Sequence, residues 1–139
     1  MTIGLLLITH NRIGDALLDV ATHMLGVCPL ATEVLAVFPD SDPDAVLKAA
    51  LERIEALNRG GGVLVLTDIY GSTPSNIARR LMENHHVKVI AGLNLPMLVR
   101  VLNYHRLSLS ELADKALSGG RDGIVPCQPT AEILKSGAS

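Results

Sequence analysis

The sequence predicts an α/β fold built on an open sheet of parallel strands with helices on both faces. Short apolar runs alternate with longer segments in which apolar residues recur at helical spacing. The joints between them are short and marked by Gly, Pro, Asn or Asp. The first run, Ile3 to Ile8, is apolar at nearly every position, which is typical of a strand buried on both faces. Strands and helices alternating through short joints favour parallel pairing with right-handed crossovers.

The first predicted strand ends in the polar pair Thr9-His10. A helix follows, and Gly26 and Pro29 end it. Its apolar face is predicted to comprise Ile13, Ala16, Leu17, Val20, Ala21 and Met24.

The second strand is predicted at Glu33 to Phe38. Asp42 then acts as the N-cap of a helix whose first residue is Pro43, and Gly60-Gly61-Gly62 ends it. The apolar positions of this helix are Val46, Leu47, Ala50, Leu51, Ile54 and Leu57.

The third strand, Val63 to Thr67, precedes a helix that Thr73-Pro74 is predicted to open with the same combination of cap and proline. The fourth strand is predicted at Val87 to Ala91. The buried face of the intervening helix is predicted to comprise Ile77, Ala78, Leu81 and Met82.

Two further helices are predicted after the fourth strand. Pro96 begins one that runs through Leu102, and a capping box of Ser108 and Glu111 begins the next, which Gly119-Gly120 is expected to end. Ile124-Val125 is predicted as a last short strand, antiparallel to the others, and a short polar tail follows from about residue 128.

Composition narrows the class of protein. The 139 residues fit one domain, and a hydrophobic fraction of 48% is high enough in so small a protein to indicate a subunit interface. No apolar run reaches the ~20 residues of a membrane span, and no signal peptide is recognisable. The net charge of -2 argues against nucleic acid binding. Cys28 and Cys127 lie outside any cysteine motif, which fits a cytoplasmic protein, although their pairing stays open.

Two strand ends are expected to meet at one crevice. In the flavodoxin-like strand order 2-1-3-4, the switch point lies between the first and third strands, which end in His10 and Asp68. An imidazole can attack phosphorus through one nitrogen when the other keeps its proton. A carboxylate that accepts that N–H fixes the tautomer and stabilises the positive charge that develops on the ring. His10 is therefore the candidate nucleophile, and Asp68 the residue that orients it.

The turn after Asp68 is the candidate site for the phosphoryl group. The hydroxyls of Ser72 and Thr73 and the backbone N–H groups at the helix start supply donors, and the helix dipole adds attraction. Gly71 is expected to let the backbone approach the ligand closely. Each of these residues also has an ordinary structural interpretation, because Asp68 could simply form a turn and Thr73 simply cap a helix. The residues alone leave both interpretations open.

Other kinds of site match less well. Gly71 to Asn76 lacks the GxxxxGK[ST] pattern of a nucleotide-binding loop. A receiver domain would place acidic residues where His10 and Asn11 stand, and a flavin site would need more aromatics than Tyr70. The adjacent histidines at 85 and 86 are more typical of a solvated helix end than of metal ligands. We therefore expect no metal and no cofactor.

The same residues carry a family resemblance. Thr9-His10, Asp68, Gly71-Ser72-Thr73-Pro74, Asn76-Ile77-Ala78 and the segment from Val89 to Leu98 resemble the enzyme IIA domain of the mannose-type phosphotransferase system, over residues 1 to about 125. The resemblance implies a flavodoxin-like dimer that exchanges a C-terminal strand. It also implies that His10 receives a phosphoryl group from the phosphocarrier HPr and passes it to a IIB domain. That IIB domain is expected on a separate chain, and any membrane contact is expected only indirectly, through IIC and IID components.

Two positions depart from the family pattern. Asn11 stands where many members have a small residue, and Gly71-Ser72 replaces the usual Gly-Gly. Two other roles stay open from the sequence: a regulatory module that senses phosphorylation without sugar transport, and the phosphoryl donor of a dihydroxyacetone kinase system.

Overall fold

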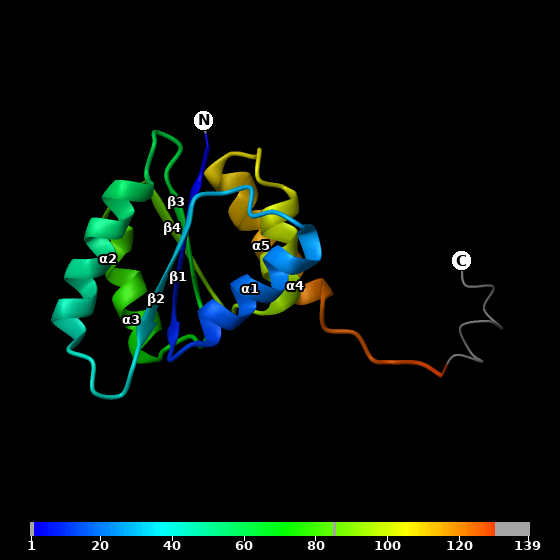
Figure 1. Ribbon diagram of the computed structural model, residues 1–139, viewed down its shortest axis with the longest axis horizontal. Helices are drawn as coiled ribbons and strands as arrows, with labels where there is room; N and C mark the ends of the chain where they lie inside the picture. Colours follow the sequence, from blue (N-terminus) through cyan, green and yellow to red (C-terminus); the bar gives the residue numbers. More distant parts are fainter. Residues whose placement is uncertain (1, 85, 130–139) are drawn as a thin grey trace.

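Four parallel strands form a single sheet in the order β2-β1-β3-β4, as the sequence predicts. The computed structural model describes residues 2–84 and 86–129 (Figure 1). The strands are β1 (Gly4–His10), β2 (Thr32–Val37), β3 (Val63–Thr67) and β4 (Val87–Ala91).

The helices cover the sheet in two layers (Figure 1). On one face lie α1 (Ile13–Leu25), α4 (Leu95–Asn103) and α5 (Leu109–Asp122). On the other lie α2 (Pro43–Leu57), α3 (Thr73–Arg80) and the 3₁₀ turn η1 (Leu81–Glu83). The doubly covered sheet explains the continuous apolar runs, because neither face of the central strands meets water.

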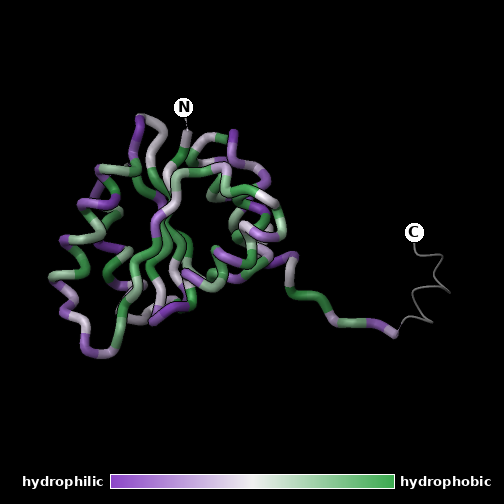
Figure 2. The backbone as a smooth tube through the Cα atoms, viewed as in Figure 1, coloured by the Kyte–Doolittle hydropathy of each residue, from purple (hydrophilic) through white to green (hydrophobic). Residues whose placement is uncertain are grey.

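Alternation along β1 assigns its side chains to the two layers. Leu5 and Leu7 pack in the core under α1, α4 and α5, whereas Leu6 and Ile8 pack in the core under α2 and α3. All four are fully buried, and the strands form the most apolar part of the chain (Figure 2).

Several predicted helix caps are confirmed. Gly26 ends α1 with a φ of 77°, in the left-handed region that favours glycine. The Asp42 carboxylate accepts the Asp44 N–H at 3.2 Å at the start of α2. Ser108 and Glu111 form the capping box of α5, and the hydrogen bonds from Ser108 lower the pKa of Glu111.

The predicted end of α5 is wrong, because the helix continues through Gly119-Gly120 to Asp122. A Cβ atom at Gly119 would lie 2.7 Å from the Cβ of Arg100, and one at Gly120 would lie 2.8 Å from the Cε of Met97. These glycines therefore allow α5 to pack closely on α4 and do not act as helix stops. The other shifts are small: β2 begins and ends one residue early, and α4 begins at Leu95, where the Asn94 side chain accepts the Met97 N–H.

The apolar face predicted for α1 is only partly covered. Ala21 is buried and Leu17 packs against the core, but Ile13 and Val20 are each 45% exposed and Met24 is 63% exposed. Leu51 of α2 and Met82 of η1, both predicted to be buried, are also exposed. In a single copy of the chain, much apolar surface therefore stays in contact with water.

Residues 123–129 leave the end of α5 and run away from the body of the molecule (Figure 1). The predicted strand at Ile124-Val125 is absent there, and these side chains are 79% and 68% exposed. Of the polar tail expected from about residue 128, positions 130–139 lie outside the described residues. In the part of the chain that the structure describes, no helix is long and apolar enough to cross a membrane.

Candidate functional site

His10 and Asp68 meet at the carboxyl edge of the sheet. His10 is the last residue of β1 and Asp68 directly follows β3, and these two strands are neighbours. The Nδ1 atom of His10 lies 2.8 Å from Oδ2 of Asp68. The same oxygen accepts the backbone N–H of His10 at 3.0 Å, while Oδ1 accepts the Ile69 N–H at 3.1 Å. The carboxylate is therefore held from three sides.

The two side chains differ in their exposure to solvent. The His10 side chain is 40% exposed, whereas that of Asp68 is 7% exposed. Because Nδ1 is bonded to Asp68, and no hydrogen bond from the described residues reaches Nε2, the ring has Nε2 available for a ligand. A carboxylate partner favours the tautomer with the proton on Nδ1, which leaves the lone pair on Nε2.

The turn after His10 is attached to the sheet at two points. The buried hydroxyl of Thr9 accepts the Gly14 N–H in the first turn of α1 at 2.9 Å. The N-cap residue, Arg12, makes no capping hydrogen bond with its side chain. The Asn11 N–H donates to the Val37 carbonyl at 2.9 Å. Asn11 has a φ of 46°, a region that glycine and asparagine tolerate better than other residues. Asparagine therefore suits the backbone conformation of this turn.

The loop after Asp68 uses its own polar groups to hold its shape. The Gly71 N–H donates to Oγ of Ser75 at 3.2 Å. The Ile69 carbonyl accepts both the Ser72 N–H at 3.3 Å and the Ser72 hydroxyl at 2.6 Å. The Ser72 hydroxyl hydrogen is therefore engaged within the loop, and donation to a phosphoryl group would require this bond to exchange.

The roles of the residues that begin α3 differ in part from those expected. Ser72 occupies the N-cap, so Thr73 is the first helical residue, and it is exposed. Gly71 has a φ of 85°, and a Cβ atom built there would meet nothing within 4 Å. Within the protein itself, the backbone conformation is therefore what favours glycine at this position. No hydrogen bond in the described part of the chain joins His10 to Gly71, Ser72 or Thr73.

The start of α3 has the polarity that suits an anion. It carries no acidic residue in its first turn, and Arg79 and Arg80 lie in its last turn. Backbone N–H groups at a helix start point outward and attract negative charge. The carboxyl edge of the sheet therefore combines the partly exposed imidazole of His10 with the buried carboxylate of Asp68. The start of α3 follows the loop that begins at Asp68.

The remaining candidates offer less chemistry. Within residues 2–84 and 86–129, no three His, Cys, Asp or Glu side chains gather closely enough to hold a metal ion. His85 lies outside the described residues. Cys28 and Cys127 are free thiols. The sequence analysis did not predict that the Thr9 hydroxyl binds the first turn of α1. The feature that could have indicated this role is a hydroxyl side chain directly after an apolar run.

Comparison with known sequences identifies relatives. The family "PTS system fructose IIA component" matches residues 4–117. The chain is 32% identical over 127 residues to the mannose-specific EIIAB component of the phosphotransferase system (PTS) of Escherichia coli K12, a match that covers 89% of this chain and 39% of that protein. The PTS fructose-specific EIIA component of Bacillus subtilis is 33% identical over 76 residues, covering 53% of this chain and 52% of that protein. The chain thus spans about two fifths of its Escherichia coli relative.

Solved structures share the fold. The mannose/sorbose-specific IIA subunit of the phosphotransferase system from Enterococcus faecalis aligns with a TM-score of 0.83 at 22% identity, covering 93% of this chain and 97% of that one. Phosphotransferase system component EIIA from Streptococcus agalactiae aligns with a TM-score of 0.77 at 26% identity, covering 89% of this chain and 96% of that one.

Proposed function

This chain belongs to the IIA component family of the mannose- and fructose-type phosphotransferase system, and on that premise we propose that it carries phosphate on His10. The phosphoryl group comes from phospho-HPr and passes to a IIB domain, which feeds sugar transport. HPr and IIB are the protein partners, the compartment is the cytoplasm, and contact with the membrane runs only through IIC and IID components.

The contact between Nδ1 of His10 and Asp68 is the observation that carries the proposal. The Nε2 lone pair attacks phosphorus and forms the new P–N bond, while the P–N bond of the donor phosphohistidine breaks and its electron pair returns to the donor ring. Positive charge grows on the His10 imidazole during attack, and the buried Asp68 carboxylate stabilises it. Discharge to IIB is the same step in reverse, with the IIB nucleophile attacking phosphorus.

The direct test is phosphorylation of the purified protein by phosphoenolpyruvate, enzyme I and HPr. We expect one acid-labile phosphate on Nε2 of His10, which ³¹P NMR distinguishes from the Nδ1 isomer. Addition of a IIB protein should then discharge it. Phosphate on Nδ1, or on another residue, contradicts the mechanism. Labelling without discharge to any IIB protein would favour the regulatory role over transport.

The start of α3 is proposed to bind the phosphoryl oxygens, and Thr73 is the residue to vary. Thr73→Val removes a hydroxyl while keeping the side-chain shape, so we expect weaker binding of inorganic phosphate and slower transfer, by roughly tenfold if one hydrogen bond to a charged group is lost. Titration with phosphate observed by NMR, together with the rate of transfer from phospho-HPr, measures both effects. Unchanged binding and transfer would remove Thr73 from the site.

Ser72→Ala is the matched comparison for Thr73→Val. Its hydroxyl donates to the Ile69 carbonyl at 2.6 Å, so we expect its removal to loosen the loop more than it weakens anion binding.

Transfer from phospho-HPr should also tolerate a chelator once enzyme I, which needs magnesium, has been removed. Arrest of transfer by the chelator at that stage would point to a metal that the proposal does not include.

A homodimer is proposed from the apolar surface that one copy leaves open. Val20 and Met24 on α1 are exposed, β4 is an edge strand, and Ile124 and Val125 project from the end of α5. A strand from a second copy added to β4 would cover an open edge, and if it carried Ile124 and Val125 it would bury that pair. The protein should therefore sediment as a dimer at micromolar concentration.

Truncation after Gly123 is expected to weaken the dimer, because it removes Ile124 and Val125. Truncation after Pro129 is the control, since it keeps the apolar pair and removes only the last ten residues. Sedimentation over a concentration series compares the two dissociation constants. A monomeric full-length protein, or equal dissociation constants for the two truncations, would contradict strand exchange.

A further inference from the structure

We propose that Tyr70, supported by Ile69, is a specificity-determining anchor for the protein that donates phosphate to His10. The loop that holds Asp68 against His10 also carries these two large side chains into solvent, where Ile69 is 61% exposed and Tyr70 is 72% exposed. This inference rests on the proposed function, because it concerns how the phosphoryl donor recognises the same site.

Tyr70 follows closely after the residue that bonds to His10. Asp68, which bonds to Nδ1 of His10, is only two residues away, so the two Cα atoms are at most about 7 Å apart. In the proposed complex, a donor that brings a phosphohistidine up to Nε2 covers part of the exposed Tyr70 side chain.

Other apolar side chains surround the same edge of the sheet. Ile13, three residues after His10, is 45% exposed, and Phe38, which follows the β2 residue paired with His10, is 39% exposed. Ile13, Phe38, Ile69 and Tyr70 all follow the carboxyl ends of parallel strands, so they lie at the same edge of the sheet as His10, and we call this set the apolar collar. Exposed apolar groups clustered around a polar centre are typical of protein interaction sites.

The Tyr70 loop is organised before any partner arrives. Gly71 and Ser72 are bonded within the loop or to the first turn of α3, as described above. The Arg79 guanidinium lies 5.8 Å from the centre of the Tyr70 ring, a cation–π contact that restricts the ring. Because little ordering remains to be done on binding, more of the contact energy can contribute to affinity.

A protein donor fits these features better than a small one. A small phosphorylated molecule needs only Nε2 and a few hydrogen-bond donors, and it cannot cover the collar. Tyr and Arg side chains dominate interface energetics when they are buried by a partner. The matching surface on the donor is an apolar patch beside its phosphohistidine, with a carbonyl or carboxylate facing Arg79.

The test compares a protein donor with a small donor on the same variants. Tyr70→Ala is expected to raise KM for phospho-HPr by at least about tenfold, as for an interface hot spot, with kcat nearly unchanged. Labelling of His10 by phosphoramidate, a small donor that phosphorylates imidazoles directly, should proceed at the wild-type rate. Tyr70→Phe should restore most of the affinity for phospho-HPr, because the ring and its contact with Arg79 remain.

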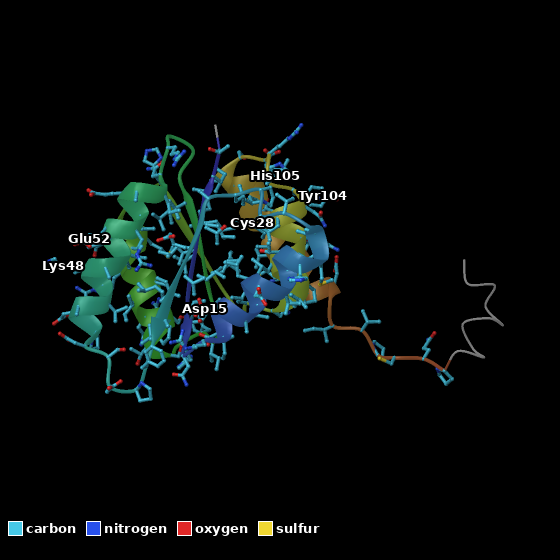
Figure 3. All side chains as sticks on the ribbon, in the orientation of Figure 1. Asp15, Cys28, Lys48, Glu52, Tyr104 and His105 are labelled. Atoms are coloured by element: carbon cyan, nitrogen blue, oxygen red, sulfur yellow. The ribbon has the colours of Figure 1, made fainter. Side chains whose placement is uncertain are left out.

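Tyr104→Ala is the matched control. Tyr104 is 45% exposed and also carries a cation–π contact, with Nζ of Lys115 at 4.3 Å from the ring centre. It lies toward the opposite end of the molecule from Asp15, which is in the first turn of α1 (Figure 3). Its replacement should leave KM for phospho-HPr unchanged.

Three outcomes would overturn the inference: an unchanged KM for phospho-HPr in Tyr70→Ala, an equal rise in Tyr104→Ala, or equal loss of labelling by phospho-HPr and phosphoramidate. The last would mean that Tyr70 only maintains the loop. A defect confined to transfer onto IIB would assign the contact to the acceptor and also contradict the inference. Failure of the proposed function is distinct, since wild-type protein would then take no phosphate from phospho-HPr.

Discussion

Replacement of His10 by alanine is expected to abolish acid-labile labelling by phospho-HPr. The side chain supplies the only nitrogen proposed to attack phosphorus, so no slower route should remain. Incubation with phospho-HPr followed by measurement of base-stable, acid-labile phosphate gives the result directly. The fold should survive, because the His10 ring is partly exposed and fills no part of either core.

His23→Ala is the control for this experiment. His23 lies on an exposed position near the end of α1, and its loss should leave labelling intact. Thermal unfolding of both variants separates a chemical defect from a folding defect. Persistent acid-labile label on a folded His10→Ala protein would assign the phosphate to another residue.

Asp68→Asn is expected to slow phosphoryl transfer by roughly 10²- to 10⁴-fold, by analogy with loss of the carboxylate in a histidine–aspartate pair. The amide keeps the shape of the carboxylate but removes its charge, so the positive charge that grows on the ring loses its partner. If the amide NH₂ group turns toward Nδ1, the ring proton moves to Nε2 and blocks the attacking lone pair. Single-turnover transfer from phospho-HPr measures the rate.

Stability should change less than rate in Asp68→Asn, because the amide oxygen can still accept one of the two backbone N–H groups that the carboxylate binds. ¹⁵N NMR of the His10 ring reports the tautomer and separates loss of charge from loss of orientation. Transfer at the wild-type rate would remove Asp68 from the mechanism. Asp68→Ala should cost more stability, since the N–H groups of His10 and Ile69 would lose their acceptor.

The parts predicted correctly from sequence depend on local patterns that the tertiary structure reinforces. The apolar run before Thr9 predicts a strand buried on both faces, and β1 indeed supplies both cores. Asp42-Pro43 and the Ser108 capping box place helix starts within a residue. The parallel order then brings the ends of β1 and β3 together, which is why the contact between His10 and Asp68 was predictable.

The wrong predictions concern residues whose environment is set by distant parts of the chain. Gly119-Gly120 looks like a helix stop by propensity, but close packing of α5 against Arg100 and Met97 makes glycine necessary inside the helix. Helical spacing identified the apolar face of α1 but not how much of it one copy of the chain covers. Ser72 and Thr73 can both cap a helix, so sequence placed the cap one residue late.

The internal bonding of the loop from Asp68 to Ser75 has a consequence for how the proposed phosphorylation of His10 could be communicated. Ile69, Gly71 and Ser72 already have partners for their N–H groups, so the bonded part of the loop has little freedom left to lose when His10 gains a phosphoryl group. A loop that is already ordered offers little conformational entropy through which a phosphoryl group could influence a distant surface. We therefore expect a regulator that distinguishes phosphorylated from unphosphorylated protein to recognise the added negative charge by direct contact with the carboxyl edge of the sheet.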